Sequence, residues 1–116
     1  MRLSEKEISN IVTALGFFIT SELNEQTGQN EQAELRLYGS RVDDKAKGGD
    51  IDLLLIVTTQ EFVAKLIYNK PEILVAIKKL LGERRIDLKI ATFSAIAEDP
   101  FLKIIFPQSI LLHKFK

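Results

Sequence analysis

The sequence predicts an α/β domain in which a mixed sheet of three or four strands packs with helices, in the order α-β-α-β-α-β. Two short segments alternate polar and apolar residues, as half-buried strands do. Longer segments place apolar residues at intervals of three and four, which is typical of amphipathic helices. The length of 116 residues suits a single domain, 1–116, that can bury a sizeable core.

The first element is predicted to be a helix that begins near residue 5. Ser4 and Glu7 have the spacing of a capping box, in which each side chain bonds the backbone of the other residue. An apolar stripe then follows at helical spacing: Ile8, Ile11, Val12, Leu15, Phe18 and Ile19. The polar segment 24–31 predicts a loop after this helix.

Two strands are expected next. Residues 34–38 alternate polar and apolar side chains, and Gly39 and Ser40 end this strand. The charged segment 41–49 closes with two glycines and predicts a short helix or turn. The second strand, 50–58, is apolar on both sides after its first carboxylates, so we expect a central strand covered on both faces.

A second helical stripe begins after Thr59 and contains Pro71, which should either kink the helix or start another one. Gly82 supplies a stop signal. The third strand is expected over 84–91, and its two faces carry different residues: Ile86, Leu88 and Ile90 on one, and Arg85, Asp87 and Lys89 on the other.

The C-terminal part is expected to return to helix over 92–106, with a break at Pro100. The apolar residues 110–112 predict either a short strand or a segment that docks on the core.

Composition limits the classes of function. The chain has no cysteine, which excludes disulfides, thiolate nucleophiles and cysteine zinc sites and suits a reducing compartment, so we expect a cytoplasmic protein. The N-terminus lacks an apolar signal core, and no segment approaches the roughly 20 apolar residues of a membrane span. The 16 basic and 16 acidic residues balance, so nucleic acid is a disfavoured partner.

The chemistry-bearing motif is a glycine and a hydroxyl followed by two aspartates. Gly39 and Ser40 offer backbone N–H groups and a side-chain donor of the kind that holds phosphate. Asp50 and Asp52, one residue apart on a strand, project from one face and can share Mg²⁺, which prefers oxygen ligands. The combination predicts nucleotidyl transfer.

Further charged residues fit the same chemistry. Asp87 would bring a third carboxylate, to ligate an ion or to take the proton of an acceptor hydroxyl. Arg41 is the best candidate to meet the β- or γ-phosphate, and Lys45, Lys47 and Lys89 are alternatives.

Each motif also has a plain structural interpretation. Gly-Ser at a strand end is most often a turn with a helix cap, and Asp-x-Asp is often a solvated strand start. Tyr38 is expected in the core, whereas Tyr68 and His113 are expected at the surface. The basic residues Lys78, Lys79, Arg84 and Arg85 indicate a solvated edge, or alternatively a docking surface for an acidic partner.

The order of these motifs resembles the minimal nucleotidyltransferase family of the polymerase beta superfamily over roughly residues 5–92. Gly39-Ser40, a nine-residue spacer and Asp50-Ile51-Asp52 carry the resemblance. It implies the nucleotidyltransferase fold, with Asp50, Asp52 and Asp87 binding two Mg²⁺ ions as the catalytic triad. It also implies that Gly39 and Ser40, with Arg41 beside them, hold the phosphates of a nucleoside triphosphate.

The resemblance also implies a function. Proteins of this family are typically paired with a separate helical protein of the HEPN or substrate-binding type, often as the antitoxin of a toxin–antitoxin pair that nucleotidylates the partner's tyrosine. The expected reaction is therefore transfer of AMP from ATP to a partner hydroxyl. The alternative is a non-catalytic, nucleotide-binding or regulatory subunit of a helical partner.

The chain also carries more apolar residues than its predicted sheet needs. They lie in the first helix and after residue 100: Phe17, Phe18, Phe101, Ile105 and Phe106. Because exposed apolar patches often mark interfaces, we expect some of them at a joint with a helical partner or a second copy, with the aspartates facing that joint.

Overall fold

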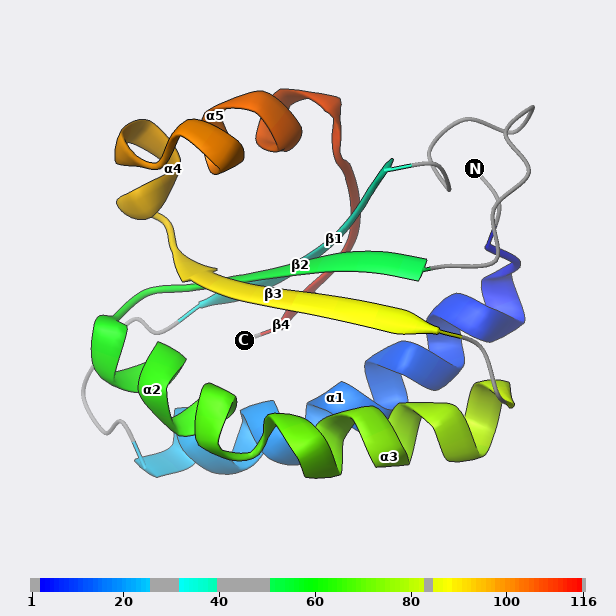
Figure 1. Ribbon diagram of the computed structural model, residues 1–116. Coiled ribbons are helices and arrows are strands. Elements are labelled where there is room, and N and C mark those ends of the chain that lie inside the picture. Colours follow the sequence, from blue (N-terminus) through cyan, green and yellow to red (C-terminus); the bar gives the residue numbers. More distant parts are fainter. Residues whose placement is uncertain (1–2, 26–31, 40–50, 83–84, 116) are drawn as a thin grey trace.

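Four strands form one mixed sheet with helices on both faces, in a computed structural model that describes residues 3–25, 32–39, 51–82 and 85–115 (Figure 1). The strand order is β3-β2-β1-β4. β2 and β3 are parallel, whereas β1 runs antiparallel to both β2 and β4. The strand bounds are Ala33–Tyr38 for β1, Ile51–Val57 for β2, Ile86–Thr92 for β3 and Ile110–Phe115 for β4. The α/β class and the mixed sheet are thus as the sequence predicts.

The first helix, α1, spans Glu5–Glu25 and confirms the predicted capping box. The Ser4 amide donates to Glu7 Oε1 at 3.0 Å, and the Glu7 amide donates to Ser4 Oγ at 3.1 Å. These two bonds satisfy amides that a helix N-terminus leaves without intrahelical partners. At its other end, α1 runs two residues into the segment predicted as a loop.

Pro71 starts a second helix rather than kinking one helix. α2 spans Gln60–Tyr68 and is capped by the Thr59 side chain, whereas α3 spans Lys70–Leu81 with the proline in its first turn. Proline is tolerated there because the first amides of a helix need no intrahelical acceptor. Gly82 ends α3 as predicted, with a φ of +87° and its amide donating to the Lys78 carbonyl at 2.8 Å.

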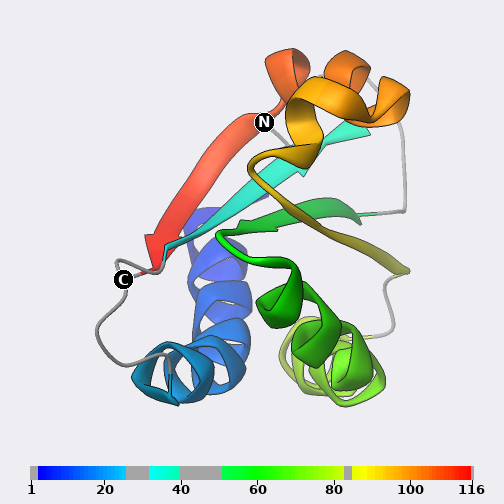
Figure 2. The ribbon, with the colours of Figure 1, turned by 90° about the vertical axis from the view of Figure 1, so that its left-hand side faces the viewer.

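The three long helices cover one face of the sheet. α1 lies beside α3, and α2 leads from β2 back along this layer (Figure 2). Apolar residues of α1, α2 and α3 pack there against alternate residues of the strands. The strand residues that join this core are Ala33, Leu35, Leu37, Ile51, Leu53, Leu55, Val57, Ile86, Leu88 and Phe115.

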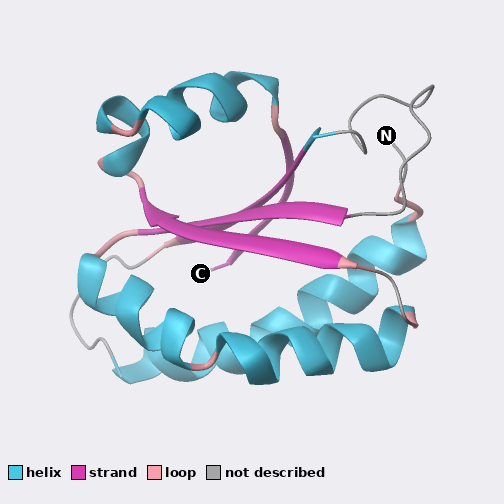
Figure 3. Cartoon of the chain, viewed as in Figure 1, coloured by secondary structure: helices cyan, strands magenta, loops and turns pink. Residues whose placement is uncertain are grey.

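Short helices cover part of the opposite face (Figure 3). α4 spans Ala95–Glu98 and α5 spans Pro100–Ile105, and a 3₁₀ helix, Phe106–Gln108, follows. The predicted break at Pro100 is confirmed. Asp99 ends α4 and caps α5 by accepting hydrogen bonds from the amides of Phe101 at 2.8 Å and Leu102 at 3.3 Å.

This second face has its own apolar cluster, formed by Tyr38, Leu54, Ile56, Ala91 and Leu102. Leu54 and Ile56 are fully buried here, while the intervening β2 residues are buried on the other face. β2 is therefore a central strand covered on both faces, as predicted.

The described elements follow the order α1-β1-β2-α2-α3-β3-α4-α5-β4. The helix or turn predicted over 41–49 lies outside the described residues. Ile110–Phe115 takes the first of its two predicted alternatives and adds β4 beside β1, with a register shift at Leu35 and Arg36. Within the described parts of the chain, no helix has the length and apolar character that crossing a membrane requires.

Candidate functional site

Asp52 and Asp87 stand side by side on neighbouring parallel strands. They are paired in the register of β2 and β3, and each is the second residue of its strand. Adjacent strands lie about 5 Å apart, and paired residues project from the same face. Asp52 is half-buried and Asp87 is exposed, so the pair lies at the rim of the sheet.

Tyr38, the last residue of β1, lies next to this pair of aspartates on a third strand, so the three residues form a row across the sheet. It is paired with Asp52 in the antiparallel register and is only 7% exposed. Burial, followed by the negative charges of Asp87 and then Asp52, raises the pKa of the Tyr38 hydroxyl from 10.0 to about 12. The phenol therefore stays protonated near neutral pH, and we call Tyr38, Asp52 and Asp87 the acidic row.

Gly39 follows directly on Tyr38 and lies against the acidic row. Its φ is +77°, a conformation that residues with a Cβ rarely adopt. A Cβ built at this position would collide with Asp52 Oδ2 and would stand 3.2 Å from the Asp52 Cγ. The positive φ therefore favours glycine, and the Asp52 carboxylate fills the space that a Cβ would occupy.

One aromatic ring of α5 adjoins the row. Phe101 is 45% exposed and meets Tyr38 edge to face, with 6.0 Å between the ring centroids. Lys89, on the same strand face as Asp87, places its Nζ 5.4 Å from the Phe101 centroid. This lysine, named above as an alternative phosphate contact, is thus held over an aromatic ring beside the carboxylates.

The backbone at the start of β2 is fixed by a bond to the segment before β3. The Ile51 amide donates to the carbonyl oxygen of Arg85 at 2.9 Å. This bond holds the two strand starts in the register that pairs Asp52 with Asp87. Five residues predicted for the site lie outside the described residues: Ser40, Arg41, Lys45, Lys47 and Asp50.

The donor set suits a hard divalent ion. Two carboxylates paired across adjacent strands present oxygens from one face, and oxygen is the ligand atom that Mg²⁺ prefers. Over residues 3–25, 32–39, 51–82 and 85–115, no group of three or more acidic, histidine or cysteine side chains gathers into a metal-binding cluster. Asp52 and Asp87 would thus hold an ion together with ligands from elsewhere, such as phosphate or water.

Tyr38, which the sequence predicts only as a core residue, also belongs to the site. Its burial is confirmed, and the negative charges of both aspartates also raise the pKa of its hydroxyl. A sequence signal exists: Glu34, Arg36 and Tyr38 share one face of the alternating strand, and Tyr38 directly precedes Gly39. Tyr68 and His113 are exposed, as predicted.

Comparison of the chain with protein families, curated proteins and solved structures yields no match.

Proposed function

We propose that the protein is a Mg²⁺-dependent nucleotidyltransferase that moves AMP from ATP to a hydroxyl group of another molecule and releases pyrophosphate. The observation that carries the proposal is the in-register pairing of Asp52 and Asp87 on parallel strands. Gly39, whose positive φ favours glycine, lies beside them. Paired carboxylates would hold a cation, and a phosphate bound to that cation would lie near the backbone of Gly39.

Each residue of the site has a distinct part in this proposal. Asp52 and Asp87 would hold Mg²⁺, which when bound neutralises negative charge on the oxygens of the triphosphate. The exposed carboxylate of Asp87 would also accept the proton of an incoming hydroxyl. Tyr38 stays neutral and is paired with Asp52 across the strands, so it adds no charge to the site.

Gly39 completes the described part of the site. Because it has no Cβ, its backbone lies directly against the Asp52 carboxylate, and a phosphate bound to an ion at that carboxylate would lie near this backbone. Ser40, Arg41 and Asp50 are proposed to add the phosphate contacts and the third carboxylate, on the strength of the sequence motif.

The acceptor is proposed to be a separate helical protein of the HEPN type, with this chain as the antitoxin of the pair. The motif resemblance supports this assignment, together with the small size of the 116-residue domain, whose described residues form one four-stranded sheet. The alternative, a non-catalytic nucleotide-binding subunit, predicts binding without transfer.

The test is transfer of label from ATP labelled at the α-phosphate, in the presence of Mg²⁺ and the product of a neighbouring gene. Asp52→Asn and Asp87→Asn should each abolish transfer while the circular dichroism spectrum stays unchanged, because both side chains lie at the rim. Glu61→Gln is the matched control, since it removes one exposed carboxylate from α2.

The outcomes separate the candidate functions. Transfer by the unmodified chain that both asparagine variants lose supports the enzyme. Mg²⁺-dependent ATP binding without transfer to any candidate partner favours the non-catalytic subunit. Undiminished transfer by either variant at saturating ATP would exclude that aspartate as an essential metal ligand.

A further inference from the structure

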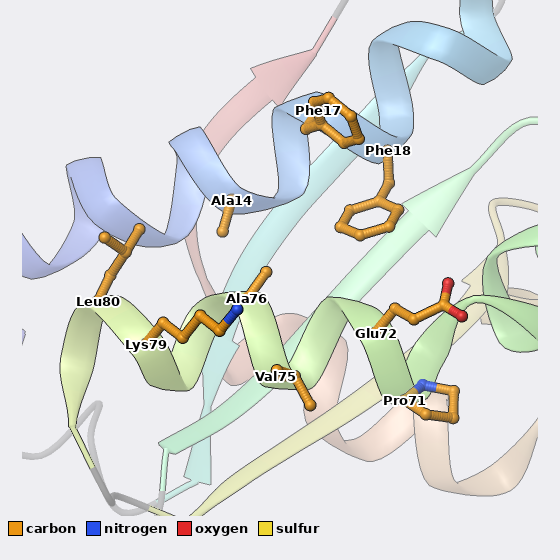
Figure 4. A pocket seen from close by; sticks show the side chains of 9 residues that line it. All are labelled: Ala14, Phe17, Phe18, Pro71, Glu72, Val75, Ala76, Lys79 and Leu80. Carbon is orange, nitrogen blue, oxygen red and sulfur yellow. The ribbon is translucent and has the colours of Figure 1, made fainter.

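A groove lies between α1 and α3 on the outer side of the helical layer. It encloses about 650 Å³ and is lined mainly by apolar side chains of the two helices (Figure 4). Three of these side chains are unusually exposed for their type: Phe17 at 78%, Val75 at 54% and Leu80 at 48%. Apolar surface of this kind on a small domain is typical of an interface.

The groove lies away from the acidic row. α1 and α3 cover the sheet face that carries Leu53 and Leu55, whereas Asp52 projects from the opposite face of the same strand. A partner seated in the groove is therefore separated by the sheet from the aspartates of the same protomer. The apolar residues that were expected at one interface therefore lie in two places: Phe17 lies in the groove, and Phe101 lies beside the acidic row.

The groove has one acidic and one basic residue at equal distances from the middle of α3. Glu72 and Lys79 both line it, and they lie seven residues, or two turns, apart on one side of α3. Val75 and Ala76 occupy the midpoint between them and also line the groove. An antiparallel pairing of two α3 helices about this midpoint sets Glu72 of each copy opposite Lys79 of the other.

We infer that a second copy of this chain occupies the groove and forms a twofold symmetric dimer through α1 and α3. A twofold interface brings the same patch of both copies together, so it requires a self-complementary surface. The apolar midpoint between one acidic and one basic residue meets that requirement. The formal net charge of zero also means that two copies do not repel each other over long range.

The first test is the oligomeric state by sedimentation velocity from micromolar to millimolar concentration. The chain should form a dimer, and Val75→Glu should convert it to a monomer because two glutamates would meet at the symmetry axis. Ile104→Glu is the matched control: Ile104 is 63% exposed on α5, and its substitution should leave the dimer intact.

Charge exchange gives the sharper test. Glu72→Lys alone brings two lysines together at each of the two symmetry-related contacts, and Lys79→Glu alone brings two glutamates together at each of them. Each variant should weaken the dimer by about tenfold or more, because like charges face each other across the interface. A mixture of the two variants should recover dimers, since each variant then faces its opposite charge, and the double variant should also dimerise.

Circular dichroism of each variant establishes that the fold is retained before association is measured. Recovery of dimers without larger species in the mixture supports the twofold pairing, because a head-to-tail contact between the same two residues would leave free ends and form longer chains. The proposal is overturned if the unmodified chain stays monomeric at millimolar concentration, or if a dimer forms that neither charge variant weakens. A monomer that instead binds an amphipathic helix of another protein would likewise overturn it.

Discussion

Gly39 and the carboxylate of Asp52 occupy neighbouring positions so closely that no side chain fits between them. The glycine has a φ of +77°, and the residue before it, Tyr38, is paired with Asp52 on the adjacent strand. The position of one metal-binding candidate is thus linked to the backbone conformation at the end of β1. This relationship allows the site to be altered without changing any of its charges.

Gly39→Ala should lower both stability and Mg²⁺-dependent nucleotide binding. The positive φ costs about 1 to 2 kcal/mol for a residue with a Cβ, and the methyl group displaces the Asp52 carboxylate. Urea unfolding measures the first effect, and calorimetric titration with ATP and Mg²⁺ measures the second.

Gly82→Ala is the matched control for this variant. Gly82 also has a positive φ, +87°, but a Cβ there meets no atom within 4 Å. The Gly82→Ala variant should therefore lose stability through backbone strain but still bind nucleotide as the unmodified chain does. Equal binding by the two alanine variants would show that the contact between Gly39 and Asp52 has no part in the site.

The protonation of Tyr38 should report directly on the acidic row. The chain has two tyrosines and no tryptophan, so Tyr68→Phe leaves Tyr38 as the one phenol that absorbs on alkaline titration at 295 nm. Its pKa should lie near 12, and Asp87→Asn in the same background should lower it, because the charge of Asp87 raises it. A titration midpoint that Asp87→Asn leaves unchanged would place the two side chains too far apart to interact.

The raised pKa of Tyr38 also predicts how stability changes at high pH. Below pH 10 the phenol is protonated in both the folded and the unfolded chain, so its contribution is fully present. Between pH 10 and 12 the unfolded chain releases this proton first, and stability falls. A difference of about two pKa units corresponds to about 3 kcal/mol.

Tyr38→Phe isolates this contribution, because lysines also lose their charge over the same pH range. The free energy of unfolding, from urea titrations at pH 9 and pH 11.5, should fall less in the phenylalanine variant than in the unmodified chain. An identical fall in both proteins would contradict the assignment.

Much of this fold follows from local signals in the sequence. Ser4 and Glu7 predict the start of α1 because the capping box needs only residues of one turn, and both of its hydrogen bonds are present. Pro71 left two alternatives open, since whether it kinks or starts a helix depends on how α2 and α3 pack. The alternation of polar and apolar residues in β3 likewise predicts that Asp87 and Lys89 share the face opposite to Ile86 and Leu88.

The parts that the sequence did not predict depend on contacts between distant segments. The sequence predicts that Asp52 and Asp87 share one site, but their residue-to-residue pairing is set by the β2–β3 ladder and by the bond from Ile51 to Arg85, which no local pattern encodes. The position of the groove was also unforeseen, because the side-by-side packing of α1 and α3 decides which of their apolar residues stay exposed.

Arg36 links β1 to the segment that leads into β4, and its loss should destabilise the sheet edge. Its guanidinium donates to Glu34 Oε1 at 3.1 Å and to Ser109 Oγ at 3.2 Å, and lies 4.3 Å from the centroid of the Phe106 ring. Arg36→Met keeps much of the side-chain volume but removes both hydrogen bonds. We expect a loss of about 1 to 3 kcal/mol in the free energy of unfolding, measured in urea, because Glu34 is 14% exposed and loses its nearest cation.

Arg36→Lys and Lys103→Met make the cause of that loss testable. Lysine keeps a positive charge near Glu34 but cannot reproduce the planar fork that reaches Ser109 and stacks on Phe106, so it should recover only part of the stability. Lys103 is an exposed cation of α5, and its replacement by methionine should change stability by about 0.5 kcal/mol or less. If Arg36→Met costs no more than Lys103→Met, the contacts of Arg36 do not hold β4 to the sheet, which then depends on the β1–β4 ladder and on the apolar packing of Phe115 and Leu112.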